Sequence, residues 1–151
     1  MVLPKTMRLK GHRCFDHLYR YGTRYHEPSI LLRVVKSENK LHKSPKKLVA
    51  SQACRCAIAI SSKVNKKAVI RNRLRRVIHE HLRSRLSKAS QHSNKWALFS
   101  LKHHASTKDP LILLEECDRL LVKAGLLQWT LLKKKSSMKV DLQKVIWLSI
   151  Y

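Results

Sequence analysis

The residues best suited to chemistry form a run of arginines near the middle of the chain. Four of the six residues from Arg71 to Arg76 are arginine, and no acid interrupts them. A guanidinium presents a planar fork that matches phosphate, and Asn72 can donate to phosphate, sugar or a base edge without adding charge. A merely solvated helix face usually interleaves Glu with Lys to balance itself, which this run does not do. The run therefore predicts an anion-binding surface.

The whole chain shares this excess of positive charge. Its 151 residues include 33 Lys and Arg against 9 Asp and Glu, a formal charge of +24, which repels itself unless an anion is nearby. Nucleic acid and an anionic membrane surface both meet that need, but no stretch approaches the roughly 18 apolar residues of a membrane-spanning helix. Residues 1–10 mix basic and apolar side chains, which is not typical of a signal peptide. We expect a cytoplasmic protein with a nucleic-acid partner and no membrane.

Other chemistry fits the sequence less well. The nine acids are scattered, so no paired-carboxylate catalytic site is predicted, and the nine histidines fall mainly in polar segments. The four cysteines lack the paired spacing of a structural zinc site. Cys54 and Cys56 would share one side of a strand, as small, reduced, half-buried side chains. We expect no catalytic residue and no metal ligand in the protein itself.

Hydrophobic spacing places the arginines on a long helix over about 67–87. Its apolar residues fall in one stripe when successive residues are turned by about 100°. The polar residues occupy the rest of the circumference as a cationic surface with a single acid, Glu80. The residues expected on that surface are Asn72, Arg73, Arg75, Arg76, His79 and Arg83.

The remaining elements predict one α+β domain with helices packed on a sheet. A short amphipathic helix is expected over 13–21, and strands over 30–35, 55–61 and 96–101. A closing helix over 111–124 has a start signal in Asp109-Pro110 and a stop signal in Gly125. Residues 37–52 read as a polar loop in which 47–50 form a possible extra strand, and 128–151 as a basic tail outside the core.

The segment from Ser61 to Glu80 closely resembles the signature of the protein subunit of bacterial-type ribonuclease P, including the core Arg71-Asn72-Arg73. A second pattern of that family recurs near the start of the chain. It consists of Arg8-Leu9, Phe15, Tyr19 and Gly22-Thr23. The resemblance covers roughly residues 8–127, and its composite pattern is specific.

The resemblance implies an α-β-β-β-α-β-α sandwich with a mixed four-stranded sheet and a left-handed β-α-β crossover, against the usual right-handed rule. It assigns 1–127 to the domain and 128–151 to an extension. It also implies a protein that serves a large catalytic RNA. That RNA removes the 5′ leader of precursor tRNA with Mg²⁺ ions held mainly by the RNA. The protein binds both RNAs, helps the catalytic RNA hold these ions and is not expected to form homo-oligomers.

The resemblance also assigns roles to residues. Those expected to face the catalytic RNA are Lys63, Lys67, Arg71, Asn72, Arg73, Arg75 and Arg76. Those expected to line a leader-binding cleft are Arg8, Arg13, Phe15, Tyr19 and Arg33, with Arg20 and Arg24 as further contacts to the leader backbone. Aromatic rings suit this role because they cover the faces of unstacked bases. The alternative for Phe15 is a place in the core.

The chain departs from the family pattern at several positions. Ser62 stands where Lys is usual and Asn65 where Gly is usual, although Asn tolerates a positive φ well enough to keep the turn. Lys102 stands where the family has Arg. Two other interpretations stay open: an RNA-binding module of the ribosomal-protein type, and a DNA-binding protein, for which no paired-helix reading head is recognisable.

Overall fold

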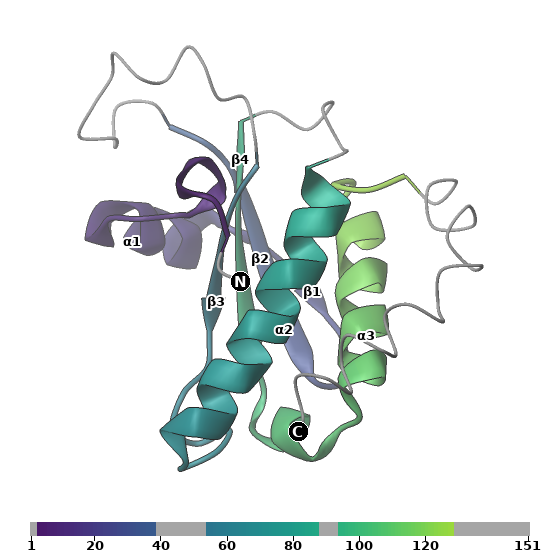
Figure 1. The fold of residues 1–151 in the computed structure, drawn as a ribbon. Helices are drawn as coiled ribbons and strands as arrows, with labels where there is room; N and C mark the ends of the chain where they lie inside the picture. Colours follow the sequence, from purple (N-terminus) through teal and green to yellow (C-terminus); the bar gives the residue numbers. More distant parts are fainter. Residues whose placement is uncertain (1–2, 39–53, 88–93, 129–151) are drawn as a thin grey trace.

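The computed structural model describes residues 3–38, 54–87 and 94–128, which fold as an α+β sandwich (Figure 1). The helices are α1 (His12–Tyr21), α2 (Ala68–Leu86) and α3 (Pro110–Lys123). The strands are β1 (Thr23–His26), β2 (Ile30–Lys36), β3 (Arg55–Ala59) and β4 (Lys95–Leu101). Short 3-10 helices span Lys5–Met7 and His103–Thr107. The element order predicted from the resemblance is confirmed.

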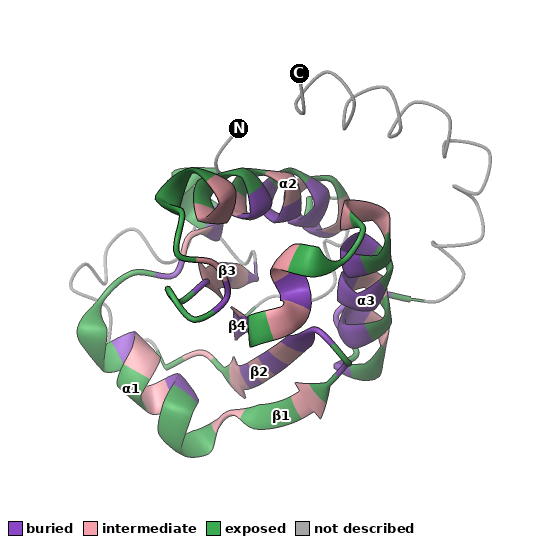
Figure 2. Ribbon diagram, turned by 90° about the horizontal axis from the view of Figure 1, so that it is seen from below, coloured by how far each residue is buried: buried purple, intermediate pink, exposed green. Residues whose placement is uncertain are grey.

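The four strands form one mixed sheet in the order β1-β2-β4-β3. β2 pairs antiparallel with β1 and β4, whereas β3 and β4 are parallel. Side chains alternate between the two faces, so Leu32 is buried on one side while Arg33 and Val35 lie half-buried on the other. Helices α2 and α3 cover the first face and α1 lies on the second, as Figure 2 shows from below.

The connection from β3 through α2 to β4 is left-handed. In Figure 1 β3 and β4 both run downward, and α2 rises on the face of the sheet that also carries α3. Figure 2 shows β3 at the edge of the sheet and β4 one strand further in. A right-handed path would carry α2 to the opposite face, beside α1. The crossover expected from the resemblance is therefore present.

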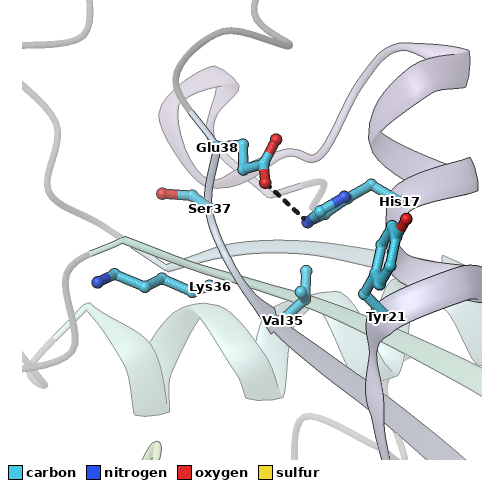
Figure 3. Close-up of a pocket in the computed structure, with 6 residues that line it drawn as sticks. All are labelled: His17, Tyr21, Val35, Lys36, Ser37 and Glu38. Atoms are coloured by element: carbon cyan, nitrogen blue, oxygen red, sulfur yellow. Dashed lines mark ion pairs between the residues drawn. The ribbon is translucent and has the colours of Figure 1, made fainter.

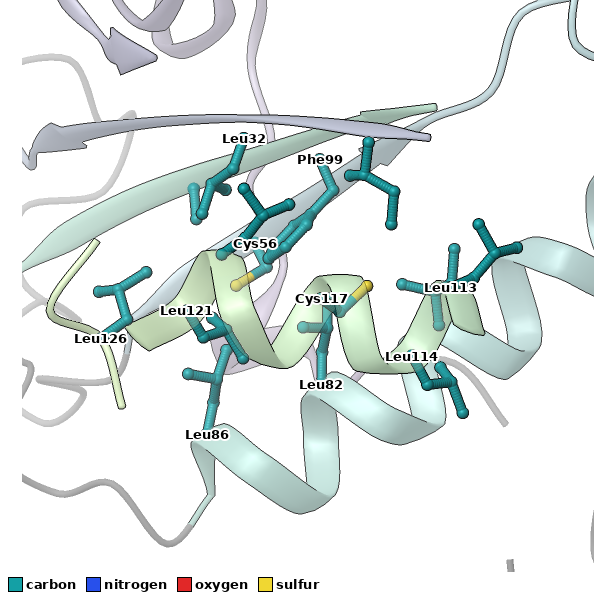
Figure 4. Packing of buried hydrophobic residues seen from close by; sticks show 14 of the residues in the cluster. Leu32, Cys56, Leu82, Leu86, Phe99, Leu113, Leu114, Cys117, Leu121 and Leu126 are labelled. Atoms are coloured by element: carbon teal, nitrogen blue, oxygen red, sulfur yellow. The ribbon is translucent and has the colours of Figure 1, made fainter. Parts of the chain in front are cut away.

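The larger core fills the space between the sheet and the two long helices (Figure 4). Leu82 from α2 and Cys117 and Leu121 from α3 meet Leu32 and Phe99 of the sheet, all of them buried. A smaller core under α1 consists of Leu9, Cys14, Leu18, Trp96 and Leu98. Each helix is thus held by the apolar stripe that its sequence predicts.

Polar contacts fix α2 against α3. The Asp118 carboxylate on α3 lies 2.7 Å from His81 Nε2 and accepts a 2.8 Å hydrogen bond from Arg85 Nη2. His81 and Arg85 both belong to the second half of α2, and little of the three side chains is exposed. These contacts set the position of α2 along α3 as well as its distance from it.

Buried polar contacts also tie α3 to the sheet. Glu116 accepts a hydrogen bond from the Ser29 backbone N–H at 2.9 Å, and Asp109 caps the start of α3, as predicted, by accepting from the Leu111 N–H. The buried Glu27 pairs with Arg119, at 3.1 Å, and with Lys123. Burial alone would raise the pKa of Glu27, but the hydrogen bonds from Lys123 and Arg119 outweigh it, so the pKa lies below the ordinary 4.5.

Several local expectations need correction. The apolar pattern did not predict β1, because Thr23–His26 is a largely exposed edge strand with little apolar alternation. His79, expected on the exposed surface of α2, is buried instead. Cys54 and Cys56 are free thiols on one side, as predicted, but are fully rather than half buried. The possible strand at 47–50 and the tail from 129 onward lie outside the described residues.

The turn before α2 forms by a different route from the one expected. Among the described residues other than glycine, only Asn94 has a positive φ, so Asn65 does not use that conformation. Its side chain instead accepts a 2.9 Å hydrogen bond from the Lys67 N–H. Asparagine thus replaces the family's usual glycine by bonding to the turn rather than by relaxing its backbone.

The lowered pKa of Glu27 predicts a pH-dependent contribution to stability. Because the folded state favours the ionised carboxylate, this contribution is complete above the unfolded pKa and is lost as the pH falls through the lower folded pKa. We expect Glu27→Gln to lower the free energy of unfolding near pH 7 by about 1.5 kcal/mol, since hydrogen bonds to a charged group are lost. Urea unfolding at a series of pH values, with the exposed Glu115→Gln as control, measures both effects. An unchanged pH slope in Glu27→Gln would contradict this assignment.

Candidate nucleic-acid interface

A tight turn over residues 61–67 delivers the chain into α2. The buried Val64 anchors the turn in the core, and its carbonyl accepts a 2.8 Å hydrogen bond from Ser106 Oγ. Arg71 Nη1 reaches back to the carbonyls of Asn65 and Lys66, at 2.7 and 2.8 Å. The first turn of α2 therefore has a fixed place relative to the sheet.

The first half of α2 carries a cationic surface that we call the α2 ridge. Its residues are Arg71, Asn72, Arg73, Arg75 and Arg76. Asn72, Arg73 and Arg76 are exposed, Arg71 and Arg75 are half-buried, and Arg75 Nη1 donates to Asn72 Oδ1 at 2.7 Å. None of the four arginines forms a salt bridge within the described part of the chain. These arginines are therefore not held by internal ion pairs, which would have contradicted the anion-binding surface predicted from the sequence.

The second half of the same helix is different. Arg85 pairs with Asp118 of α3, and Arg83 lies 4.0 Å from Glu80. The arginines in the second half of α2 thus have acidic partners, whereas those in the first half have none among the described residues. The contrast within one helix favours a role for the ridge in binding rather than in stabilising the fold.

The position of the ridge increases its attraction for anions. No acid lies in the first turn of α2, while Lys66, Lys67 and Arg71 stand close to that end. The helix dipole already places partial positive charge there, together with unpaired backbone N–H groups. Cations at this end destabilise an isolated helix, and a bound phosphate relieves the cost. Lys63 and Lys67, both exposed, extend the same charge into the turn.

The pKa of His79 reflects its burial and the positive charge beside the α2 ridge. Burial lowers its pKa from the ordinary 6.5, and the charges of Arg75 and Arg8 lower it further. Arg8 pairs with Cys56 at the edge of β3, and its Nε donates to the Leu3 carbonyl at 2.6 Å. The structure therefore brings Arg8 to the α2 side of the sheet, apart from the other residues predicted for the leader cleft.

The remaining predicted leader residues group around α1. Phe15 is half-buried against the smaller core, whereas Tyr19 is 49% exposed with the Arg33 guanidinium 4.9 Å from its ring centre. Arg24 is the Cα partner of Arg33 across β1 and β2. Arg33 Nε is buried with no hydrogen-bond partner among the described residues. We call Phe15, Tyr19, Arg24 and Arg33 the α1 face. It joins an aromatic surface to two adjacent positive charges.

Two predicted contacts lie elsewhere on α1. Arg13 and Arg20 are exposed, and the 100° helical spacing places both opposite the buried Cys14 and Leu18. They point away from the sheet. Spacing alone did not reveal the pairing of Arg24 with Arg33, because β1 was not predicted from its residues.

The described residues contain no group of three His, Cys, Asp or Glu side chains placed to hold a metal ion. Within the same ranges no helix has the length and apolar character needed to cross a membrane. The described residues of the α2 ridge and the α1 face offer cations and aromatic rings, which are groups that suit phosphates and bases.

Comparison with known proteins addresses the family directly. Residues 3–125 match the family model described as Ribonuclease P. The chain belongs to the ribonuclease P protein family. The match spans both the α1 face and the α2 ridge, so the resemblance seen in the sequence is confirmed, and the comparisons give no support to a ribosomal protein.

Similar proteins agree along nearly their whole length. The ribonuclease P protein component of Prochlorococcus marinus (strain MIT 9313) is 58% identical over 127 residues, which cover 84% of this chain and 99% of that relative. The component from Parasynechococcus marenigrum (strain WH8102) is 49% identical over 126 residues, covering 83% and 98%.

Solved structures of ribonuclease P proteins share the fold. The Staphylococcus aureus protein aligns with a TM-score of 0.65 at 18% identity, over 81% of this chain and 98% of that one. The Thermotoga maritima protein gives a TM-score of 0.59 at 19% identity, over 76% and 94%. The architecture is therefore that of the family even where little of the sequence is shared.

The contrast within α2 yields a test of the ridge. We expect Arg73→Ala and Arg76→Ala each to weaken binding to ribonuclease P RNA, and to reduce the slope of log affinity against log salt by about 1 per lost phosphate contact. Arg85→Lys, which keeps the charge beside Asp118, should leave that slope unchanged. Filter binding across a salt series measures it. Equal slopes in all variants would remove the ridge from the interface.

Proposed function

We propose that this chain is the protein component of a ribonuclease P ribonucleoprotein, in which it binds the catalytic RNA through the α2 ridge and the precursor-tRNA leader through the α1 face. The observation that carries the proposal is the set of arginines on α2 without acidic partners, in a chain that belongs to this family. Cleavage of the 5′ leader then takes place on the RNA. The protein contributes binding and charge.

The α2 ridge has the chemistry for a folded RNA. Lys63, Lys67 and the ridge side chains extend from a helix whose start is fixed by the turn before it, so their spacing is preorganised. Neutralising phosphates there reduces repulsion where RNA strands converge. The RNA would hold Mg²⁺ ions at lower free concentration as a result. In this proposal the RNA supplies most of the ligands of the Mg²⁺ ions.

The α1 face has the chemistry for a single strand. Tyr19 offers a ring on which an unstacked base can lie, with Phe15 beside it at the edge of the core. Arg33 and Arg24 lie side by side, so a phosphate between them would relieve their repulsion. Arg13 extends the charge along α1, while Arg8 would contact RNA from the α2 side.

The proposal includes a division of the chain and a setting. Residues 1–127 form the ribonuclease P protein domain and 128–151 a basic extension whose role is left unassigned. The protein acts in the cytoplasm as a single copy for each catalytic RNA. A ribosomal-type RNA-binding module would share the ridge, but it would have no use for an aromatic and basic face that suits a leader.

Reconstitution tests the proposed function directly. The full chain is added to a bacterial ribonuclease P RNA at low Mg²⁺, where the RNA alone cleaves poorly, and cleavage of a precursor tRNA is followed. We expect the chain to stimulate cleavage and to lose this effect as Mg²⁺ rises. RNA binding without stimulation would favour a general RNA-binding module and reject the proposal.

The α1 face predicts a defect confined to the leader. We expect Tyr19→Ala to weaken holoenzyme affinity for leader-bearing precursor tRNA by about tenfold, because one base loses its stacking partner. Tyr19→Phe keeps the ring and should behave as the unchanged protein. Binding of mature tRNA without a leader is the matched control. Equal losses with and without the leader would show that Tyr19 supports the fold rather than the leader.

A further inference from the structure

A hollow lies on the flank of α1 opposite Phe15 and Tyr19 (Figure 3). It is open to solvent and has a volume of about 500 Å³. Helix α1 contributes two of its residues and the end of β2 with the residues after it contributes the others. The lining residues are His17, Tyr21, Val35, Lys36, Ser37 and Glu38.

The aromatic side of the hollow is rigid but open. The Tyr21 ring is 68% exposed, and its centre lies 5.0 Å from that of His17. His17 in turn contacts the buried Trp96 edge to face, with ring centres 5.9 Å apart. Two of these three rings are held by packing, while Tyr21 leaves a large apolar face in water. Such a ring suits a flat partner that covers it.

Glu38 restricts which part of a ligand can enter. It is one of only nine acids in a chain of charge +24, and its carboxylate lies beside His17, with the Tyr21 ring beyond His17 (Figure 3). Its Oε1 lies 3.9 Å from His17 Nε2, too far for a hydrogen bond, so His17 does not occupy its acceptor positions. A phosphate would be repelled there. The carboxylate can accept hydrogen bonds from the N–H donors of a neutral group.

Positive charge lies close by for the rest of such a ligand. Lys36 and Lys95 are Cα partners at the end of β2 and β4, and Figure 3 shows the Lys36 side chain extending away from His17 and Tyr21. A flat ring with N–H donors attached to a phosphate chain is a nucleotide. Unstacked bases are commonly recognised in this way, by stacking and through their Watson–Crick edges.

We infer that this hollow binds one unstacked guanine of RNA, stacked on Tyr21 with its N1–H and N2–H₂ donors directed at Glu38. Guanine presents two adjacent donors to a carboxylate, whereas uracil sets one donor between two acceptors. The inference rests on the proposed function, because it takes RNA as the partner. It adds a base-specific contact distinct from the α1 face, and the base comes either from the leader or from the catalytic RNA.

Crosslinking in the holoenzyme distinguishes these two sources. One preparation carries 6-thioguanosine in the leader of the precursor tRNA and another carries it in the catalytic RNA. After irradiation, we expect mass spectrometry to find a crosslink on the peptide that contains His17 and Tyr21 in one preparation. The RNA that forms the crosslink is the source of the base.

Variants then test the contact quantitatively. Tyr21→Ala should weaken binding of the crosslinked RNA by about tenfold, and Tyr21→Phe should restore it to within about twofold, because stacking needs only the ring. Glu38→Gln should reduce the preference for guanine over uracil at the crosslinked position. Asp16→Asn removes an exposed acid from the same helix and is the matched control.

The outcomes separate this inference from the proposed function. If neither RNA crosslinks there and Tyr21→Ala binds both RNAs normally while Arg73→Ala still impairs assembly, the inference fails and the proposed function stands. If the unchanged protein neither assembles with the RNA nor stimulates cleavage, both are overturned. Melting temperatures of the variants confirm that any loss is not one of folding, since Tyr21 and Glu38 are largely exposed.

Discussion

The scarcity of acid is the constraint on which the rest of the structure depends. Three of the nine acids hold elements together: Glu27 and Glu116 fasten α3 to the sheet, and Asp118 fastens α2 to α3. None of these lies beside the first half of α2. The same distribution therefore stabilises the fold and leaves the ridge charged, so the proposed binding surface and the scaffold differ in where acid is placed and lie within one domain.

Local sequence patterns predicted the elements whose signals are strong within one segment. The long stripe of α2, the cap at Asp109 and the apolar run of β2 each determine a structure without distant partners. β1 has no such pattern, because an exposed edge strand depends on its neighbour for pairing. Strand order and crossover hand are set by contacts between distant residues: the strand order was not predicted, and the crossover hand was expected only from the family resemblance.

The same distinction applies to the candidate site. The ridge could be predicted because its residues are adjacent on one helix, but the burial of His79 and the position of Arg8 depend on the segment that pairs with β3. Arg24 meets Arg33 only through strand register. The hollow at His17 and Glu38 joins α1 to the end of β2, so no spacing rule could have found it. The sequence therefore indicated which residue types could bind RNA, but not which residues from different elements lie next to one another.

The position of β4 has a consequence for how the chain reaches this structure. β4 lies between β2 and β3, yet among the strands of the described residues it is the last to be synthesised, so neither neighbour can complete its hydrogen bonding before residues 95–101 are available. Such long-range pairing slows folding, because loop-closure entropy is lost before the contacts form. The sheet can therefore close only after the arginines of α2 have been synthesised, because β4 follows α2 in the chain.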